Sequence, residues 1–230
     1  MRDVKHWAAR PRPVREVLEG RYVRLEPLAP DTHGDGLFAA SSVADAEERF
    51  RWLADAPPQT RDDFQPWLEK AAASHDPLFF AVIETATGIV CGRQAIMRID
   101  AANGVAEIGS IYWGPRIAKT RLASEAFYLF ARYIFDDLGY RRVEWKCNDR
   151  NASSKRAALR FGFSFEGVFR QHMVVKGENR DTAWFSLLAH ESPLVRQGIE
   201  LWLAPENFDT AERQKENLGM FMERVRGGTA

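Results

Sequence analysis

The stretch VAEIGSIYWGPRIAKTRLASEAFYLFARYIFDDLGYRRVEWKC, residues 105–147, decides the fold of this chain. It opens with a strand-like run (105–113), and after a short turn apolar side chains recur at helical spacing over residues 121–138. Gly139 then ends the helix, and residues 141–147 have the pattern of a second strand. A strand, a helix and a strand in this order predict two parallel strands joined by a right-handed crossover.

The residues before this unit predict an antiparallel meander that leads into it. Two apolar runs on either side of Gly88 should form a hairpin, and the turn AANG joins that hairpin to the strand at 105–113. Further upstream, Thr60 is placed to cap a helix. The expected strands lie at 21–28, 78–85 and 89–100, and the expected helices at 31–42, 45–55 and 61–73.

After the unit, Asn151 is expected to cap a short helix over residues 153–161, which Gly162 ends. Residues 163–175 and 180–189 predict a closing hairpin. The fold is therefore predicted to be α+β, with a mixed central sheet, an antiparallel meander plus a β-α-β unit, flanked by helices. The expected organisation is an N-terminal arm over residues 1–19, one domain over 20–190 and a helical C-terminal extension over 191–230.

The charge balance gives no support to a nucleic-acid or membrane-surface role. Lys plus Arg and Asp plus Glu number 32 each in 230 residues, so the formal net charge is zero. No run approaches the roughly 18 apolar residues that span a bilayer, and no secretory signal is evident, so we expect a cytoplasmic protein. Cys91 and Cys147 are expected to be buried thiols, and the histidines have no metal-ligand spacing, so no metal is expected.

The turn within the deciding stretch, RIAKTRLASEA (116–126), poses a question about anion binding. A turn between a strand and a helix N-terminus commonly binds an anion, and such turns use glycine so that the backbone approaches the ligand closely. This turn has no glycine, but it carries Lys119 and Arg121. It is therefore a lost site, an ordinary surface turn, or an anion site that relies on charge.

Four motifs occur in order along the chain: Glu107-Ile108-Gly109, Ser124-Glu125-Ala126, Asn151 to Ser154 and Gly162 to Arg170. In this order and spacing they resemble the GNAT-family N-acetyltransferases, and most closely the Rim-type branch, which is similar to the ribosomal-protein N-terminal acetyltransferases. The resemblance covers about residues 20–190, and it implies the GNAT fold and acetyl-CoA as co-substrate.

The resemblance also implies a set of cofactor-binding residues. The family's pyrophosphate loop, Q/R-x-x-G-x-G/A, falls on six residues here, and its central glycine is replaced by Arg121. We expect charge from Lys119 and Arg121 to take over from the glycine, and the backbone to approach the pyrophosphate if φ stays negative through the turn. The implied cofactor-binding residues are Ile111, Ala118, Lys119, Thr120, Arg121, Leu122, Ala123, Asn151 and Ser154.

Acetyl transfer to an amine needs a base, because the amine must lose a proton. The family's motif implies that Glu107 is this base, and two-residue periodicity should place it on one strand face with Gly109, Ile111 and Trp113. Ser154 is the candidate donor to the departing sulfur. Many GNAT enzymes have a tyrosine acid on the same helix, where this chain has Ala158.

The acceptor site is less defined in the sequence. Trp113, Trp145 and His172 are the candidate substrate-binding residues, although aromatic side chains more often belong to a core. Trp145 lies on the strand that should splay away from residues 105–113. A nucleophilic Cys147 is a weaker alternative, because no histidine or aspartate stands at a triad spacing.

The function implied is acetyl-CoA-dependent N-acetylation of a primary amine by direct transfer in a ternary complex. The acceptor is a protein or peptide N-terminus or a small amine. The alternative is a non-catalytic GNAT-fold domain that binds CoA as a sensor or serves as an interaction domain. The helical tail after residue 190 either covers the acceptor site or forms a homodimer, and the sequence does not decide between the two.

Overall fold

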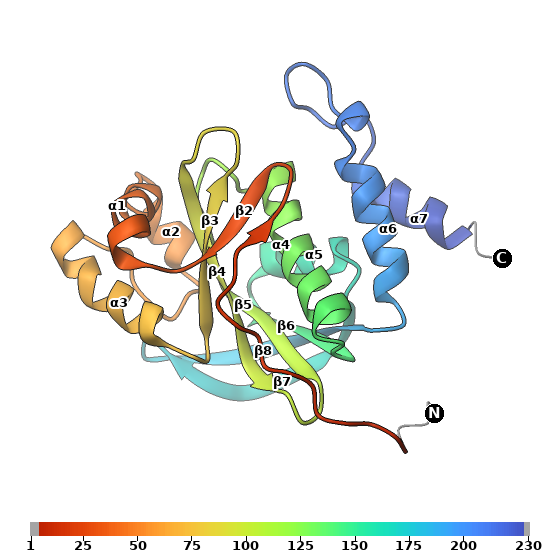
Figure 1. The fold of residues 1–230 in the computed structure, drawn as a ribbon. Helices are drawn as coiled ribbons and strands as arrows, with labels where there is room; N and C mark the ends of the chain where they lie inside the picture. Colours follow the sequence, from red (N-terminus) through yellow and green to blue (C-terminus); the bar gives the residue numbers. More distant parts are fainter. Residues whose placement is uncertain (1–4, 228–230) are drawn as a thin grey trace.

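The computed structural model describes residues 5–227 and shows an eight-stranded sheet between two groups of helices (Figure 1). The strand order is β1-β2-β3-β4-β5-β6-β8-β7, and of these neighbours β5 and β6 are the parallel pair. The mixed sheet predicted from sequence is confirmed. The strands are β1 (Leu18–Glu19), β2 (Val23–Pro27), β3 (Leu78–Glu84), β4 (Val90–Asp100), β5 (Val105–Trp113), β6 (Arg142–Asn148), β7 (Ser164–Val175) and β8 (Glu178–Leu188).

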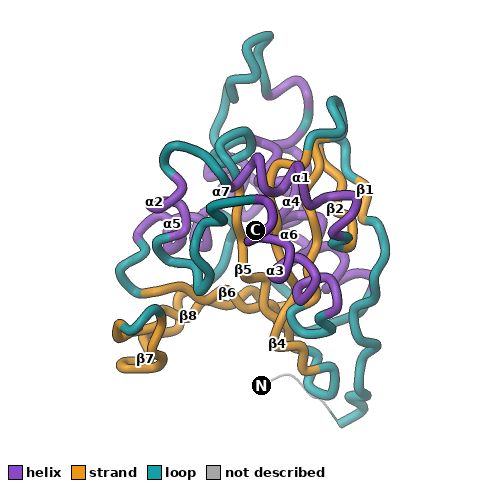
Figure 2. Tube along the Cα trace, turned by 90° about the vertical axis from the view of Figure 1, so that its left-hand side faces the viewer, coloured by secondary structure: helices purple, strands orange, loops and turns teal. Residues whose placement is uncertain are grey.

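The helices cover both faces of the sheet. Helices α1 to α3 lie on one side and α4 to α7 on the other, and the β7–β8 hairpin forms one edge (Figures 1 and 2). Thr60 caps α3 as predicted, because its hydroxyl accepts from the Asp63 N–H at 3.1 Å. The α-helices are α1 (Pro30–Ser41), α2 (Ala46–Phe50), α3 (Arg61–Ala73), α4 (Arg121–Arg132), α5 (Ala152–Arg160), α6 (Ser192–Leu203) and α7 (Leu218–Gly227).

Two predicted helices differ from the observed ones at their ends. The helix expected over 45–55 is wrong beyond Phe50, where α2 stops. Phe50 is anchored in the core, and the chain then turns so that the Asp55 carboxylate pairs with Arg93 of β4. The helix expected over 121–138 is α-helical only to Arg132 and closes in a π-helical turn over Tyr133–Asp137.

The segment after residue 190 shares the core of the main domain. Val195 and Ile199 of α6 and Met222 of α7 belong to the same buried cluster as α4 and the sheet. Helix α6 lies along α4, where the Tyr128 hydroxyl donates to Glu200 at 2.6 Å. The C-terminal segment is therefore on the α4 side of the sheet, and its last residues, 228–230, lie outside the described residues.

The N-terminal arm is extended, as its prolines predict, and runs beside the β4–β5 turn. The Arg10 N–H donates to the Ala101 carbonyl at 2.9 Å, and the Trp7 indole donates to Ala102 at 2.7 Å. Its last two residues form β1, which pairs with β2. Residues 1–4 of the arm lie outside the described part of the chain.

Candidate functional site

Strands β5 and β6 separate after three paired positions. Val105 pairs with Arg142, Ala106 with Val143 and Glu107 with Glu144, and no later residues of the two strands pair. The splay predicted between these strands is therefore confirmed. The ends of both strands are left with unpaired backbone groups that can receive an extended ligand.

A bulge at Ser110 changes the face of the sheet on which the last side chains of β5 lie. Ser110 has φ +47°, and the register with β4 slips so that Gly109 opposes Ala95 and Tyr112 opposes Arg93. Because one extra residue is inserted, Tyr112 joins Gly109 and Glu107 on one face.

The predicted common face of Glu107, Gly109, Ile111 and Trp113 is therefore wrong for its last two members. Ile111 and Trp113 pack against the core on the α4 side instead. There the Trp113 indole donates to Gln94 at 3.2 Å and its ring meets Phe161 edge-on, with centroids 6.3 Å apart. Strict two-residue periodicity fails at this point because a bulged strand advances by three residues between equivalent positions.

Glu107 lies buried on the opposite face, in a network of charges. Its Oε2 accepts from Arg98 Nη1 at 2.7 Å and lies 3.0 Å from Lys146 Nζ. Lys146 also lies 2.6 Å from the Glu144 carboxylate, so one ammonium bridges the two splaying strands. Gly109 leaves room beside Glu107, because a Cβ there would come 2.6 Å from Met97 Sδ and 2.9 Å from Glu107 Oε1, so both side chains would have to shift.

In the loop between β5 and α4, Lys119 has a strained backbone conformation. Lys119 is exposed and has φ +65°, the left-handed conformation that glycine favours, so the expectation of negative φ through this turn is wrong. Arg121 begins α4 as its first helical residue, so the position of the family's central glycine needs no special backbone conformation here. The Thr120 hydroxyl caps the helix by accepting from Leu122 N at 3.2 Å.

The Arg121 side chain faces the C-terminal segment. Its guanidinium carbon lies 4.2 Å from the ring centre of Tyr22 and 4.9 Å from that of Phe208, and Nη2 contacts Glu212 at 2.7 Å. The buried Nε has no acceptor among the described residues. Sequence reasoning missed Phe208 and Glu212, because nothing local connects them with the turn. Of the other predicted loop residues, Ala118 is half-buried, and Leu122 and Ala123 are buried in the first turn of α4.

Ser154 and Asn151 start α5 as the sequence predicts. The Asn151 side-chain oxygen accepts from the Ser154 N–H at 3.0 Å, and the Ser154 hydroxyl accepts from the Trp145 indole at 2.9 Å. Trp145 is buried on the α4 side, beside Phe127, Phe161 and Phe163. It therefore does not share the face of Glu107, and its contact with Ser154 is one that sequence reasoning missed.

His172 does lie on the face of Glu107, beside two aromatic rings. Its Nδ1 is 3.0 Å from the Thr182 hydroxyl, and its ring centre is 5.6 Å from Phe169 and 6.0 Å from Trp184. Lys146 Nζ stands 3.8 Å from the Trp184 ring centre. The sequence analysis did not select Lys146 as a site residue. Two-residue alternation along β6, which places Lys146 on the same face as Glu144, could have identified it.

Cys147 does not suit nucleophilic catalysis. It is a free, buried cysteine, and burial raises the pKa of its thiol, which disfavours the reactive thiolate. Within residues 5–227, no group of three or more His, Cys, Asp or Glu side chains is arranged to hold a metal ion. No helix in this range is long and apolar enough to cross a membrane.

Comparison with known families agrees with this geometry. The family described as "Acetyltransferase (GNAT) domain" matches residues 23–164, which include β5, the loop before α4, and α5. A GCN5-related N-acetyltransferase from Brucella melitensis is 63% identical, with a TM-score of 0.94, covering 95% of this chain and 99% of its own. A microcin C7 self-immunity acetyltransferase, solved with acetyl-CoA and AMP, shares the fold at 20% identity and a TM-score of 0.63, covering 74% of this chain and 93% of its own.

Two curated relatives match a shorter part of the chain. "Uncharacterized N-acetyltransferase p20" of Bacillus licheniformis is 34% identical over 116 residues, or 49% of this chain. "Putative ribosomal N-acetyltransferase YdaF" of Bacillus subtilis is 30% identical over 105 residues, or 45% of this chain. The matched regions span 62% and 56% of these relatives, so both comparisons cover less than two thirds of their length.

Proposed function

This chain belongs to the GNAT acetyltransferase family, and from that premise we propose that it transfers the acetyl group of acetyl-CoA to a primary amine. The transfer is direct, within a ternary complex of protein, acetyl-CoA and amine. One observation carries this proposal: the buried Glu107 carboxylate stands at the last paired position before β5 and β6 separate. A proton acceptor at the mouth of such an opening is what amine acetylation requires.

The residues around the opening fit acetyl-CoA. The first turn of α4 offers backbone N–H groups and the positive end of the helix dipole to a pyrophosphate, although the Leu122 N–H is already taken by Thr120. The exposed Lys119 adds a positive charge beside them. When bound, acetyl-CoA supplies an activated thioester, so the protein has only to position the reactants and move protons.

Two side chains perform those proton transfers in our proposal. Glu107 takes the proton of the attacking amine, directly or through a water molecule. Ser154 donates toward the departing sulfur: its oxygen already accepts from the Trp145 indole, and its proton, which lies beside the Cys147 thiol, turns to the sulfur of CoA. Ala158 is fully buried and offers no acid of its own.

The acceptor is a primary amine of a peptide N-terminus or of a small molecule. The Bacillus subtilis relative, named as a putative ribosomal N-acetyltransferase, supports the first of these. The test is thiol release from acetyl-CoA across a panel of peptides and small amines, with product mass as the second readout. A CoA-induced thermal shift without thiol release from any amine would favour the alternative, a non-catalytic CoA-binding sensor, for which the glycine-free loop is the supporting observation.

A further inference from the structure

The charged side chains around Glu107 nearly all have partners of opposite sign. Arg98 and Lys146 pair with Glu107, and Lys146 also pairs with Glu144. On the same face, Arg142 of β6 bridges Glu144 of β6 and Glu166 of the edge strand β7. Each of the three carboxylates in this network therefore has at least one cationic partner.

Arg180 of β8 is the exception. Within residues 5–227 its buried Nε has no hydrogen-bond acceptor, and no carboxylate forms an ion pair with its guanidinium. It nevertheless lies close enough to Glu107 and Arg98 for their charges to act on it, and burial lowers its pKa. Glu107 is the counter-charge that acts on Arg180, but its carboxylate is already bound by Arg98 and Lys146. The partly buried guanidinium therefore lacks a hydrogen-bonded acceptor, which an anionic ligand would supply.

A second hydrogen-bond donor without an acceptor in the described part of the chain, the Trp184 indole N–H, lies on the same face of β8. The Trp184 indole N–H is buried and has no acceptor among the described residues. Arg180 and Trp184 are four residues apart on β8, and alternation along the strand puts both on the face of Lys146, which pairs in register with Trp184. Phe169 packs against Trp184 with ring centres 4.4 Å apart, so the donors are bordered by an apolar wall.

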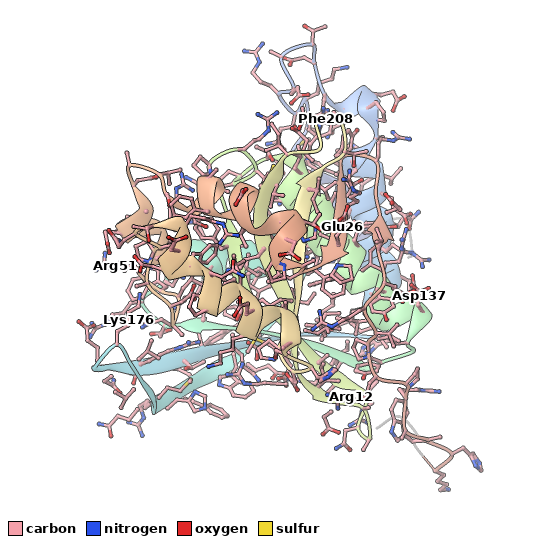
Figure 3. The ribbon with its side chains drawn as sticks, turned by 60° about the vertical axis from the view of Figure 1, so that its left-hand side comes forward. Arg12, Glu26, Arg51, Asp137, Lys176 and Phe208 are labelled. Atoms are coloured by element: carbon pink, nitrogen blue, oxygen red, sulfur yellow. The ribbon has the colours of Figure 1, made fainter. Side chains whose placement is uncertain are left out.

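The tip of the same hairpin is held against α2. Lys176 Nζ donates to the Phe50 carbonyl at 3.0 Å, and Figure 3 shows Lys176 beside Arg51 at this junction. Strand β8 pairs with β6 from Thr182 to Leu188, and Arg180 pairs with Met173 of β7. Trp184 and Arg180 therefore lie on a paired strand, which suits specific recognition.

We propose that Arg180 recognises an anionic group of the acceptor, with the Trp184 indole as a neutral donor on the same strand face, so that the preferred acceptors are primary amines that carry a carboxylate. This inference rests on the proposed acetyl transfer and specifies its substrate class. Arg180 pairs with the carboxylate, and the Trp184 indole donates to a carbonyl oxygen further along the acceptor. The carboxylate belongs either to a free amino acid or to an acidic residue of a short peptide, because both present the same chemistry.

The experiment compares matched acceptors that differ only in charge. β-Alanine is paired with β-alaninamide, and the peptide Ala-Asp-Gly-amide with Ala-Asn-Gly-amide. Calorimetric affinity in the presence of CoA is measured for each, together with kcat and KM for acetylation. For at least one pair, we expect the wild-type protein to bind the acid about 10- to 100-fold more tightly than the amide, the range for charge-assisted hydrogen bonds. The pair that shows the difference identifies the source of the carboxylate.

Amino-acid substitutions then show which residue causes the preference for the acid over the amide. Arg180→Gln should remove the preference for the acid, Arg180→Lys should retain part of it, and KM for acetyl-CoA should not change in either. Trp184→Phe should weaken binding of acid and amide alike, because the indole donor does not select for charge. Arg132→Gln removes the same charge from the end of α4, on the other side of the sheet, and should leave the preference intact.

The outcomes separate this inference from the proposed function. Equal binding of acids and amides, or a loss of acetyl-CoA affinity in Arg180→Gln, would overturn the inference even if acetylation proceeds. Preferential binding of acids without any acetylation would uphold the recognition site and refute the transferase.

Discussion

Arg121 and Glu212 are 91 residues apart in the chain and form an ion pair in which Arg121 Nη2 and Glu212 Oε1 are 2.7 Å apart. Arg121 begins α4, and Glu212 lies in the loop between α6 and α7 that projects at the top of Figure 1. The pair thus joins the N-terminus of the central helix to the C-terminal segment. An anion that arrives at this helix N-terminus competes with Glu212 for the same guanidinium.

Loss of charge at the loop should weaken CoA binding. Arg121→Ala and Lys119→Ala are each expected to cost about 1–2 kcal/mol at low salt, in the range for hydrogen bonds to charged groups. The effect of Lys119→Ala should shrink as salt rises, because that side chain is exposed. Glu212→Gln should strengthen CoA binding, since it releases Arg121.

Calorimetry at two salt concentrations measures all three variants. Unchanged affinity in the double variant Lys119→Ala/Arg121→Ala would show that the turn is an ordinary surface turn. A thermal unfolding scan of each variant without CoA separates loss of binding from loss of the contacts that Arg121 makes with Tyr22 and Phe208.

Glu107→Gln should lower kcat by about 100-fold while acetyl-CoA binding is nearly unchanged, since a general base contributes about that factor or more. The matched control is Glu144→Gln. Glu144 pairs with Glu107 across the strands and holds the same Lys146, but it is not assigned a proton transfer. Steady-state rates of the two variants decide the role of Glu107: equal losses would assign both carboxylates to the ion network rather than to catalysis.

Ser154→Ala should reduce kcat roughly ten-fold, the equivalent of about one hydrogen bond, because water can replace a lost hydroxyl. Trp145→Phe removes the indole that donates to Ser154 and leaves the hydroxyl in place, so it tests whether that hydrogen bond orients the donor. Steady-state kinetics with separate acetyl-CoA titrations provide the measurement. If Ser154→Ala lowers CoA affinity more than kcat, the residue binds the cofactor and does not donate to the sulfur.

Glu125 of the Ser124-Glu125-Ala126 motif should be essential for stability. Its buried carboxylate accepts from the backbone N–H groups of Arg21, Tyr22 and Val23 at 3.0, 2.6 and 2.7 Å. Glu125→Ala leaves the buried Val23 N–H unsatisfied and exposes the part-buried N–H groups of Arg21 and Tyr22 to water, so it should cost about 2 kcal/mol, within the range of about 1–3 kcal/mol for a buried donor.

Urea unfolding measures that loss. Glu125→Gln keeps one acceptor oxygen and should be destabilised less than Glu125→Ala. Equal stability of Glu125→Ala and the wild-type protein would mean that water replaces the carboxylate at this turn, and the motif residue would then need another explanation.

Local patterns in the sequence were sufficient for the order of elements and the crossover. Apolar spacing predicted α4, the Thr60 and Asn151 caps both form, and the parallel pairing of β5 with β6 followed from the strand-helix-strand order. The helix and its caps depend on residues within a few positions of one another, and the parallel pairing follows from the order of the three elements, so a single sequence contains the information that determines them.

The tertiary structure decided which face each site residue occupies and what it contacts. The bulge at Ser110 moved Trp113 away from the face of Glu107, and alternation along the strand gives no sign of an inserted residue. The partners of Arg121 and the missing partner of Arg180 are set by segments far apart in the chain that meet only in the folded protein. The sequence by itself therefore determined the fold and family, whereas the charge pairing of the site depends on contacts between distant residues, which no local pattern encodes.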